Sequence, residues 1–139
     1  MKIKVMIAMV ACVNAQGIHA AQMQSVTKSS ALIAPLLSEP LAGIEGKDAV
    51  MLTVEYAPGA ASAAHRHNAN VFVYVLEGSV VMQVAGGKEQ TLTAGQTFHE
   101  LPTDVHTVSR NASTTQKAKI LVFTIKNKDA PVTVPVSGS

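Results

Sequence analysis

The chain has 139 residues, which is enough for one domain with a single hydrophobic core. Hydrophobic residues make up 47% of it and charged residues 14%, a balance that excludes a disordered protein or one that coats nucleic acid. With no Trp, three Phe and two Tyr, the core must be aliphatic.

Residues 1–20 have the order of regions found in a secretory signal peptide. The basic stretch MKIK is followed by the apolar stretch VMIAMVACV, which is too short to span a bilayer, and then by the more polar NAQGIHAAQ. Small residues in this last stretch suit cleavage after Ala15 or after Ala20. We therefore predict a periplasmic or secreted protein, with no membrane insertion after processing.

Removal of the signal changes the charge of the chain. Eleven Lys and Arg stand against nine Asp and Glu, and Lys2 and Lys4 leave with the signal, so the mature chain has nine of each and is formally neutral. No basic excess remains to attract nucleic acid or anionic lipid. Cys12, the single cysteine, also lies in the signal, which leaves the mature chain without disulfide or thiol chemistry. The stretch MVAC around it leaves lipid anchoring as a minor alternative.

Residues 21–47 mix Leu and Ile with Ser, Pro and Gly, as in SSALIAPLLSEPLAGIEG. This composition favours an extended N-terminal arm laid across a core rather than a helix. The arm carries more Leu and Ile than a free segment needs. We therefore expect it to cover a sheet edge of a second copy in a homodimer.

Residues 48–126 show a period of two, which indicates strands. Turn residues separate the segments, as at Pro58-Gly59 and at the corner Pro102-Thr103-Asp104. Short strands at this spacing, with no helical period, predict an all-β domain that is closed or sandwiched and antiparallel. The segments are AVMLTVEYA, VFVYVLEG, SVVMQVAG, EQTLTAG, QTFHEL, HTVSRN and KILVFTIK. The Pro- and Ser-rich residues 127–139 are expected to form a C-terminal tail outside the barrel.

Two histidines, His65 and His67, open the segment HRHNANVFVYVLEG. On a strand they point to the same face with Cα atoms roughly 6.6 Å apart, so both imidazoles can reach one ion about 2.1 Å from each nitrogen. The same alternation puts Val71 and Val73 on the ligand face. His106 follows the corner LPTDVH at the start of another strand and is the third candidate. Three neutral imidazoles can hold Zn, Fe, Ni, Cu or Mn and leave coordination positions open.

These residues fall into two motifs that resemble those of the cupins. The matching residues are Gly59, His65, Arg66, His67 and Gly78 in the first motif, and Gly95, His106 and Asn111 in the second. The resemblance covers residues 48–126 and is specific, because both motifs occur in order at a fitting separation. It implies a single-domain cupin barrel (a double-stranded β-helix or jelly roll), a metal in its mouth and commonly a dimer.

The chain departs from the cupin pattern at three positions. Val71 stands where cupins usually place a glutamate ligand, and Leu101 and Thr103 stand where the second motif usually has proline and glycine. Two interpretations stay open: a three-histidine site similar to that of the diketone-cleaving dioxygenases and cysteine dioxygenase, or a barrel that has lost its metal. We favour the three-histidine site, because drift that abandoned the metal would have no reason to spare three histidines.

Glu100 is the candidate catalytic residue. Its place six residues before His106 is similar to that of a pocket glutamate in three-histidine cupins, where it would hydrogen-bond a ligand or a metal-bound water. Strand alternation in QTFHEL gives Glu100 the same face as Phe98. A surface carboxylate at a strand end is the alternative interpretation.

The substrate pocket is expected to be lined by Val71, Val73, Gln83 and Phe98. Gln83 is the lone amide in SVVMQVA, and a surface position is the alternative for it. His99 falls on the opposite face of its strand, where we expect a surface or interface histidine.

Two classes of function follow for a chain with this site. The first is a metal-dependent oxygenase, in which the three histidines hold Fe(II) or a similar divalent ion and a small enolisable or phenolic substrate chelates it. The second is a non-catalytic barrel of the cell envelope that captures a small ligand or a metal. No phosphate loop, nucleophile elbow or paired carboxylates support a kinase, serine hydrolase or glycosidase.

Overall fold

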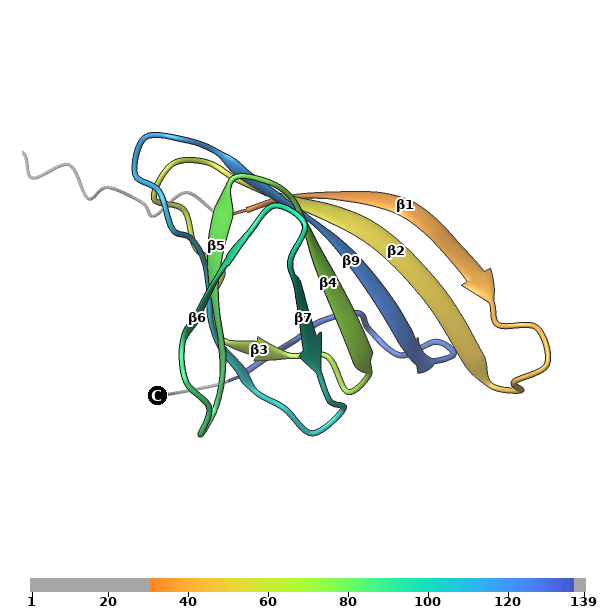
Figure 1. The fold of residues 1–139 in the computed structure, drawn as a ribbon. Coiled ribbons are helices and arrows are strands. Elements are labelled where there is room, and N and C mark those ends of the chain that lie inside the picture. Colours follow the sequence, from red (N-terminus) through yellow and green to blue (C-terminus); the bar gives the residue numbers. More distant parts are fainter. Residues whose placement is uncertain (1–30, 137–139) are drawn as a thin grey trace, which may run out of the picture.

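The computed structural model describes residues 31–136, which form ten β-strands in two antiparallel sheets (Figure 1). These residues contain no helix, which confirms the all-β prediction. The described part of the chain therefore has no helix long and apolar enough to cross a membrane. The predicted signal peptide, residues 1–20, lies outside the described residues.

Each sheet has five strands, and most neighbouring strands within a sheet are not consecutive in the chain. The first sheet, in spatial order, consists of β1 (Leu32–Pro40), β2 (Lys47–Tyr56), β9 (Ala118–Asn127), β4 (Asn70–Glu77) and β7 (Thr97–Glu100). The second sheet consists of β10 (Val134–Pro135), β3 (His65–Arg66), β8 (His106–Asn111), β5 (Ser79–Val84) and β6 (Gln90–Thr93). Every predicted strand segment corresponds to a strand here, while β1, β3 and β10 were not predicted as separate strands.

The two sheets enclose an aliphatic core, as the composition predicted. On β4, Val71, Val73 and Val75 are buried, whereas Phe72 and Tyr74 between them are each 44% exposed. The division follows from the pleat, because successive side chains on a strand point to opposite faces. Further buried side chains from both sheets complete the core, among them Tyr56, Val80, Met82, Ile120 and Val122.

Two residues of the predicted motifs serve the fold. Gly78 turns the chain between β4 and β5 with φ of 72°, and a Cβ there would lie 2.5 Å from the carbonyl oxygen of Lys117. Only glycine fits this position. The buried side chain of Asn111 donates to the carbonyl oxygens of Ala57 and Gln116, at 3.1 and 2.8 Å. It thereby ties together two loops at one end of the barrel.

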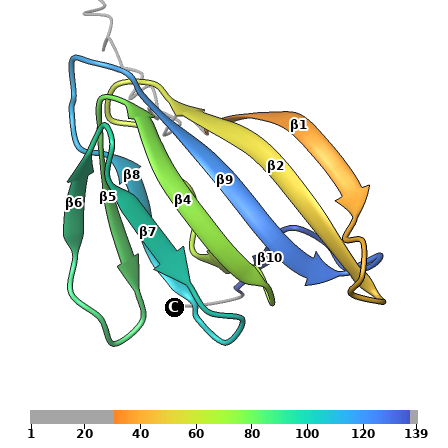
Figure 2. The same cartoon turned by 45° about the vertical axis from the view of Figure 1, so that its right-hand side comes forward.

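The ends of the described chain both take part in the sheets (Figure 2). The N-terminal arm is extended, as expected: its residues 32–40 form β1, an edge strand paired with β2. The tail differs from expectation, because Val134 and Pro135 pair with Arg66 and His65 and so add β10 to the second sheet. The free edge of β3 explains the difference, since an unpaired edge offers backbone N–H and C=O groups to any nearby extended segment.

Candidate metal centre

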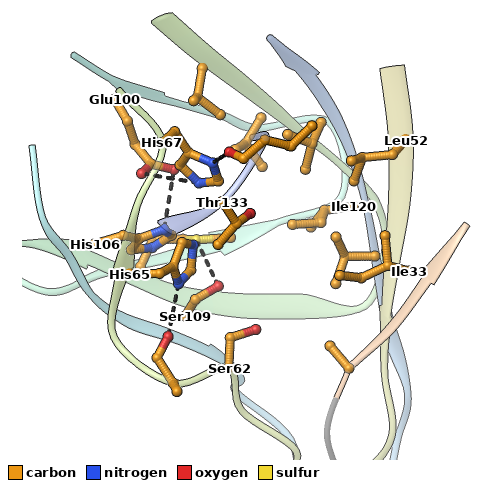
Figure 3. Close-up of a pocket in the computed structure, with 18 of the residues that line it drawn as sticks. Ile33, Leu52, Ser62, His65, His67, Glu100, His106, Ser109, Ile120 and Thr133 are labelled. Atoms are coloured by element: carbon orange, nitrogen blue, oxygen red, sulfur yellow. Dashed lines mark hydrogen bonds and ion pairs between the residues drawn. The ribbon is translucent and has the colours of Figure 1, made fainter. Parts of the chain in front are cut away.

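The three predicted histidines meet at one end of the space between the sheets. His65 on β3 and His106 on β8 are direct cross-strand partners, and their ring centroids lie 5.1 Å apart. His67 follows just beyond β3, with its ring centroid 4.8 Å from that of His65. One nitrogen from each imidazole lies within 4.8 Å of the other two (Figure 3).

Backbone carbonyl groups orient two of these imidazoles. His65 Nδ1 lies 2.8 Å from the oxygen of Ala63, and His67 Nδ1 lies 2.7 Å from the oxygen of Val132. Because a carbonyl oxygen only accepts, each Nδ1 must carry the proton, which leaves the lone pair of each Nε2 free. A second nitrogen fixed in this way is the usual arrangement of a metal-binding histidine.

His106 is the most deeply buried of the three, with 3% of its surface exposed. Its Nδ1 lies 3.1 Å from Glu100 Oε1, but the contact is not aligned as a hydrogen bond, and neither imidazole nitrogen has a hydrogen-bond partner within residues 31–136. A buried nitrogen without a partner costs free energy. A cation that accepted a lone pair from His106 would remove part of that cost.

The donor set therefore fits a divalent transition metal. Neutral imidazole nitrogens suit Zn, Cu, Fe and Ni. Two nitrogens bound tetrahedrally at about 2.1 Å from an ion lie about 3.4 Å apart, so the imidazoles would draw slightly together on binding.

Glu100 supplies a carboxylate to the same cluster from β7. It is 2% exposed and stands directly opposite Val71 on β4, so it is not a surface carboxylate. Its Oε2 lies 3.8 Å from His67 Nε2, in addition to the 3.1 Å contact with His106. Glu100 thus brings a carboxylate to the histidines from the residue paired with Val71, the position where the cupin pattern would have one.

The surroundings lower the pKa values of two groups in the site, Glu100 and His65. Burial alone would raise the pKa of Glu100, but the contact with His106 and the positive charges that the three histidines can carry outweigh it and lower this pKa. Burial lowers the pKa of His65, and the neighbouring His67 and His106 lower it further against the effect of the Ala63 carbonyl. Near neutral pH the site therefore holds an ionised carboxylate beside a neutral His65, which favours a bound cation.

A cavity of about 330 Å³ opens beside the histidines. Figure 3 shows the histidines and Glu100 along one side of it, with Leu52 and Ile120 on the side across from them. The Tyr56 hydroxyl also reaches its lining and lies 2.6 Å from Ser109 Oγ. Among the described residues that line it, none is Lys or Arg. The volume and the apolar wall are typical of a site for a small molecule.

The structure places two of the four predicted pocket residues in this lining, Val71 and Val73. Gln83 is elsewhere, contrary to expectation, and its side-chain amide donates to the carbonyl oxygen of Gly87 at 2.8 Å. The reason is strand alternation, because its neighbour Met82 takes the inward position on β5.

Phe98 lies behind the cluster rather than in the cavity lining. It is buried and packs against the imidazole of His106, with centroids 5.9 Å apart. His99, next to it on β7, is exposed and stacks on Phe72 at 4.7 Å. The two neighbours thus occupy opposite faces of the first sheet, as the alternation predicted for His99.

Several lining residues were missed by sequence reasoning. They include Tyr56 and the tail residues Val132 and Thr133. Alternation along AVMLTVEYA could have identified Tyr56 as inward-facing. For the tail the stretch VTV was a weak strand signal, too short to predict its partner.

Comparison with known proteins shows that residues 52–124 match the family described as the cupin domain. No curated protein matches the chain.

Solved structures share the fold at low sequence identity. A double-stranded β-helix protein from Klebsiella pneumoniae is 18% identical with a TM-score of 0.61, and the match covers 81% of this chain and 89% of that one. The DMSP lyase DddQ from Ruegeria pomeroyi is 14% identical with a TM-score of 0.64, over 86% and 59%. An oxalate oxidase in complex with the substrate analogue glycolate is 22% identical with a TM-score of 0.61, over 81% and 57%. These likenesses confirm the predicted jelly-roll barrel.

Proposed function

The chain belongs to the cupin family, and on that premise we propose that it binds one divalent transition metal through His65, His67 and His106 and acts on a small molecule that chelates the metal. The observation that carries the proposal is the convergence of three imidazoles, one of them buried without a hydrogen-bond partner, beside a buried carboxylate. Such a set is costly to bury without an ion and well suited to hold one.

We favour Fe(II) and an oxygenase reaction, with Zn, Mn, Ni or Cu as the other metals that the nitrogen ligands suit. When bound, the metal would supply Lewis acidity and, if redox-active, electron transfer to oxygen. Three protein ligands leave room in the coordination sphere for a chelating substrate.

Glu100 is the chain's own candidate for proton transfer. Its lowered pKa leaves it ionised at neutral pH, and its oxygens lie at the histidine cluster in a site that is shielded from solvent. A carboxylate so placed can accept a proton from an enolisable carbon or a phenol as the substrate binds.

The cavity selects for the body of that substrate. Its apolar wall, built by residues such as Leu52, Val54 and Ile120, favours an aliphatic or aromatic group. Because no Lys or Arg occurs among its described lining residues, the second carboxylate of a dicarboxylate would lie there without a cationic partner. A small enolisable or phenolic compound that carries one negative charge fits best.

The alternative is a non-catalytic barrel that holds a small ligand or a metal. The apolar cavity favours this alternative as much as it favours an enzyme, since cupin-type barrels host several activities on one fold. The likeness to an oxalate oxidase does not decide between the two, because at 22% identity it bears on the fold alone.

Elemental analysis of protein purified without added metal, followed by oxygen-uptake measurements, tests the proposal. We expect retained iron and oxygen uptake that depends on a β-diketone or a catechol, with oxalate inactive. Zinc without oxygen uptake would favour the binding barrel. A protein that binds none of Fe(II), Zn(II) or Mn(II) in a calorimetric titration would contradict the proposal.

Two further proposals concern the setting of the protein. We propose that residues 1–20 direct export, which an intact-mass measurement on envelope fractions tests.

A homodimer is also proposed, because β1 is an edge strand whose Leu32, Ile33, Leu36 and Leu37 are all exposed and would be covered by a second copy. Sedimentation at micromolar concentration tests this, and a clean monomer would contradict it.

A further inference from the structure

We propose that residues 130–136, here called the C-terminal strap, contribute to metal binding at the three-histidine site. In this view the carbonyl group of Val132 is a positioning group for His67, and docking of the strap and binding of the metal strengthen each other. The inference rests on the proposed metal-binding function and adds a segment that lies far from both cupin motifs in the sequence.

The strap is held against β3 at several points. It leaves β9 through a turn in which Ala130 N donates to Asn127 O, and it then returns to β3, as Figure 1 shows. There β10 pairs with His65 and Arg66, and Val136 N donates to Ala64 O at 3.4 Å. The strap therefore runs beside the strand that carries the first histidine.

The hydrogen bond between strap and His67 has a consequence for metal binding. His67 lies just past the end of β3, and the next residue, Asn68, has φ of 50°, so the strand ladder does not constrain this ring. The 2.7 Å contact of Nδ1 with Val132 O is the only side-chain hydrogen bond of His67 within the described residues. It sets which nitrogen carries the proton and aims Nε2 into the cluster.

The strap also forms part of the cavity wall. Val132, Thr133 and Pro135 line the cavity, and Figure 3 shows Thr133 between the histidines and the apolar side. Without the strap this side of the cavity would open to water, which weakens electrostatic interactions within it.

Strap docking is expected to be marginal by itself. The paired part, β10, has two residues, and Pro135 has no N–H to donate to the ladder. A metal that binds His67 in the orientation set by Val132 would stabilise the docked strap, and by reciprocity the docked strap would raise metal affinity by the same factor.

Hydrogen exchange and matched variants of the full chain test the inference, with Zn(II) as the probe. In the parent, saturating Zn(II) should slow amide exchange at Val132, Thr133, Val134 and Val136, the strap residues after Ala130 that have an N–H. His65→Ala and His67→Ala each remove one ligand, but only His67→Ala removes a side-chain hydrogen bond to the strap, since the strap pairs with His65 through the backbone. At saturating Zn(II) we therefore expect protection of the strap to persist in His65→Ala and to vanish in His67→Ala. A strap with a merely structural role would show no response to Zn(II).

Truncation gives a second, independent measurement. Deletion of residues 131–139 should lower Zn(II) affinity about 10- to 100-fold, the usual cost of losing a group that orients a metal ligand, whereas deletion of residues 137–139 should leave it unchanged. Equal affinities for two folded truncations, or strap exchange in the parent that Zn(II) does not change, would overturn the inference. If the longer truncation fails to fold, the exchange measurement decides. A parent that binds no Zn(II) would instead contradict the proposed metal site and remove the basis of this inference.

Discussion

The two faces of the first sheet are built from the same strands but differ in what they carry. On the inner face, β4 and β7 present Val71, Val73 and Glu100 to the cavity. On the outer face the same two strands present Phe72, Tyr74 and His99 to solvent. Both faces hold apolar side chains and an ionisable residue, so residue type alone does not distinguish them.

The difference between the faces lies in burial and convergence. Glu100 is buried and lies 3.1 Å from His106 and 3.8 Å from His67. The adjacent His99 is exposed and stacks on an aromatic ring. A titratable side chain gains unusual chemistry when it is withdrawn from water and placed among others. The inner face therefore carries the candidate site.

The largest expected effect is on metal affinity, when a histidine of the inner face is compared with a histidine of the outer face. His106→Ala should lower Zn(II) affinity by more than about 100-fold, beyond the usual cost of losing an outer-shell group, because it removes a ligand. Its free energy of unfolding should change little, since the substitution also removes two buried nitrogens that lack partners. Calorimetric titration and thermal unfolding measure both quantities.

His99→Ala is the matched control for this prediction. It deletes an exposed imidazole on the outer face of β7 and leaves the histidine cluster untouched, so Zn(II) affinity should equal that of the parent. Equal affinities for the parent and His106→Ala would show that His106 is not a ligand.

A second substitution removes the charge of the inner carboxylate. Glu100→Gln keeps the shape of the side chain but loses its negative charge, and metal affinity should fall about 10- to 100-fold. Glu77→Gln serves as the control, since this exposed carboxylate lies 3.5 Å from Lys117 Nζ and away from the cavity lining. The same titrations apply, and an unchanged affinity for Glu100→Gln would remove this residue from the site.

In the metal-free protein, substitutions on the inner face should lower the free energy of unfolding more than substitutions on the outer face. Val75→Ala, at a fully buried position of β4, should lower the free energy of unfolding by about 2 kcal/mol through lost burial and a cavity. Leu76→Ala, next along the strand and half exposed, should stay within about 0.5 kcal/mol of the parent. Urea unfolding of the metal-free proteins measures the difference, and equal losses would contradict the assignment of faces.

The smallest effect is the pH dependence of metal binding. Protons compete with the metal for the neutral nitrogen of His65. Burial keeps the pKa of this imidazole below 6.5. Affinity should therefore fall as pH drops through that lowered pKa, by about tenfold per pH unit for each proton displaced. Glu100 adds no proton competition in this range because its own pKa is also lowered. Affinity that rose on acidification would contradict histidine ligation.

Local patterning made most of the barrel predictable. The period of two in VFVYVLEG assigned Val71 and Val73 to one face and Phe72 and Tyr74 to the other, and the structure agrees. The alternation repeats every two residues, so it can be read from the sequence without knowing which strands pair with one another. Where only one amide stood out, at Gln83, reasoning from residue type gave the wrong face, because Met82 occupies the inward position.

The sequence by itself determined the all-β class, the aliphatic core, the turns and the pair His65 and His67 at a spacing that suits one ion, since each depends on residues close together along the chain. Only the tertiary structure decided that His65 and His106 are cross-strand partners, that Glu100 stands opposite Val71, and that the C-terminal strap returns to His67. These are contacts between distant segments. Which edges pair depends on backbone hydrogen bonding and burial summed over the whole barrel, which no local pattern encodes.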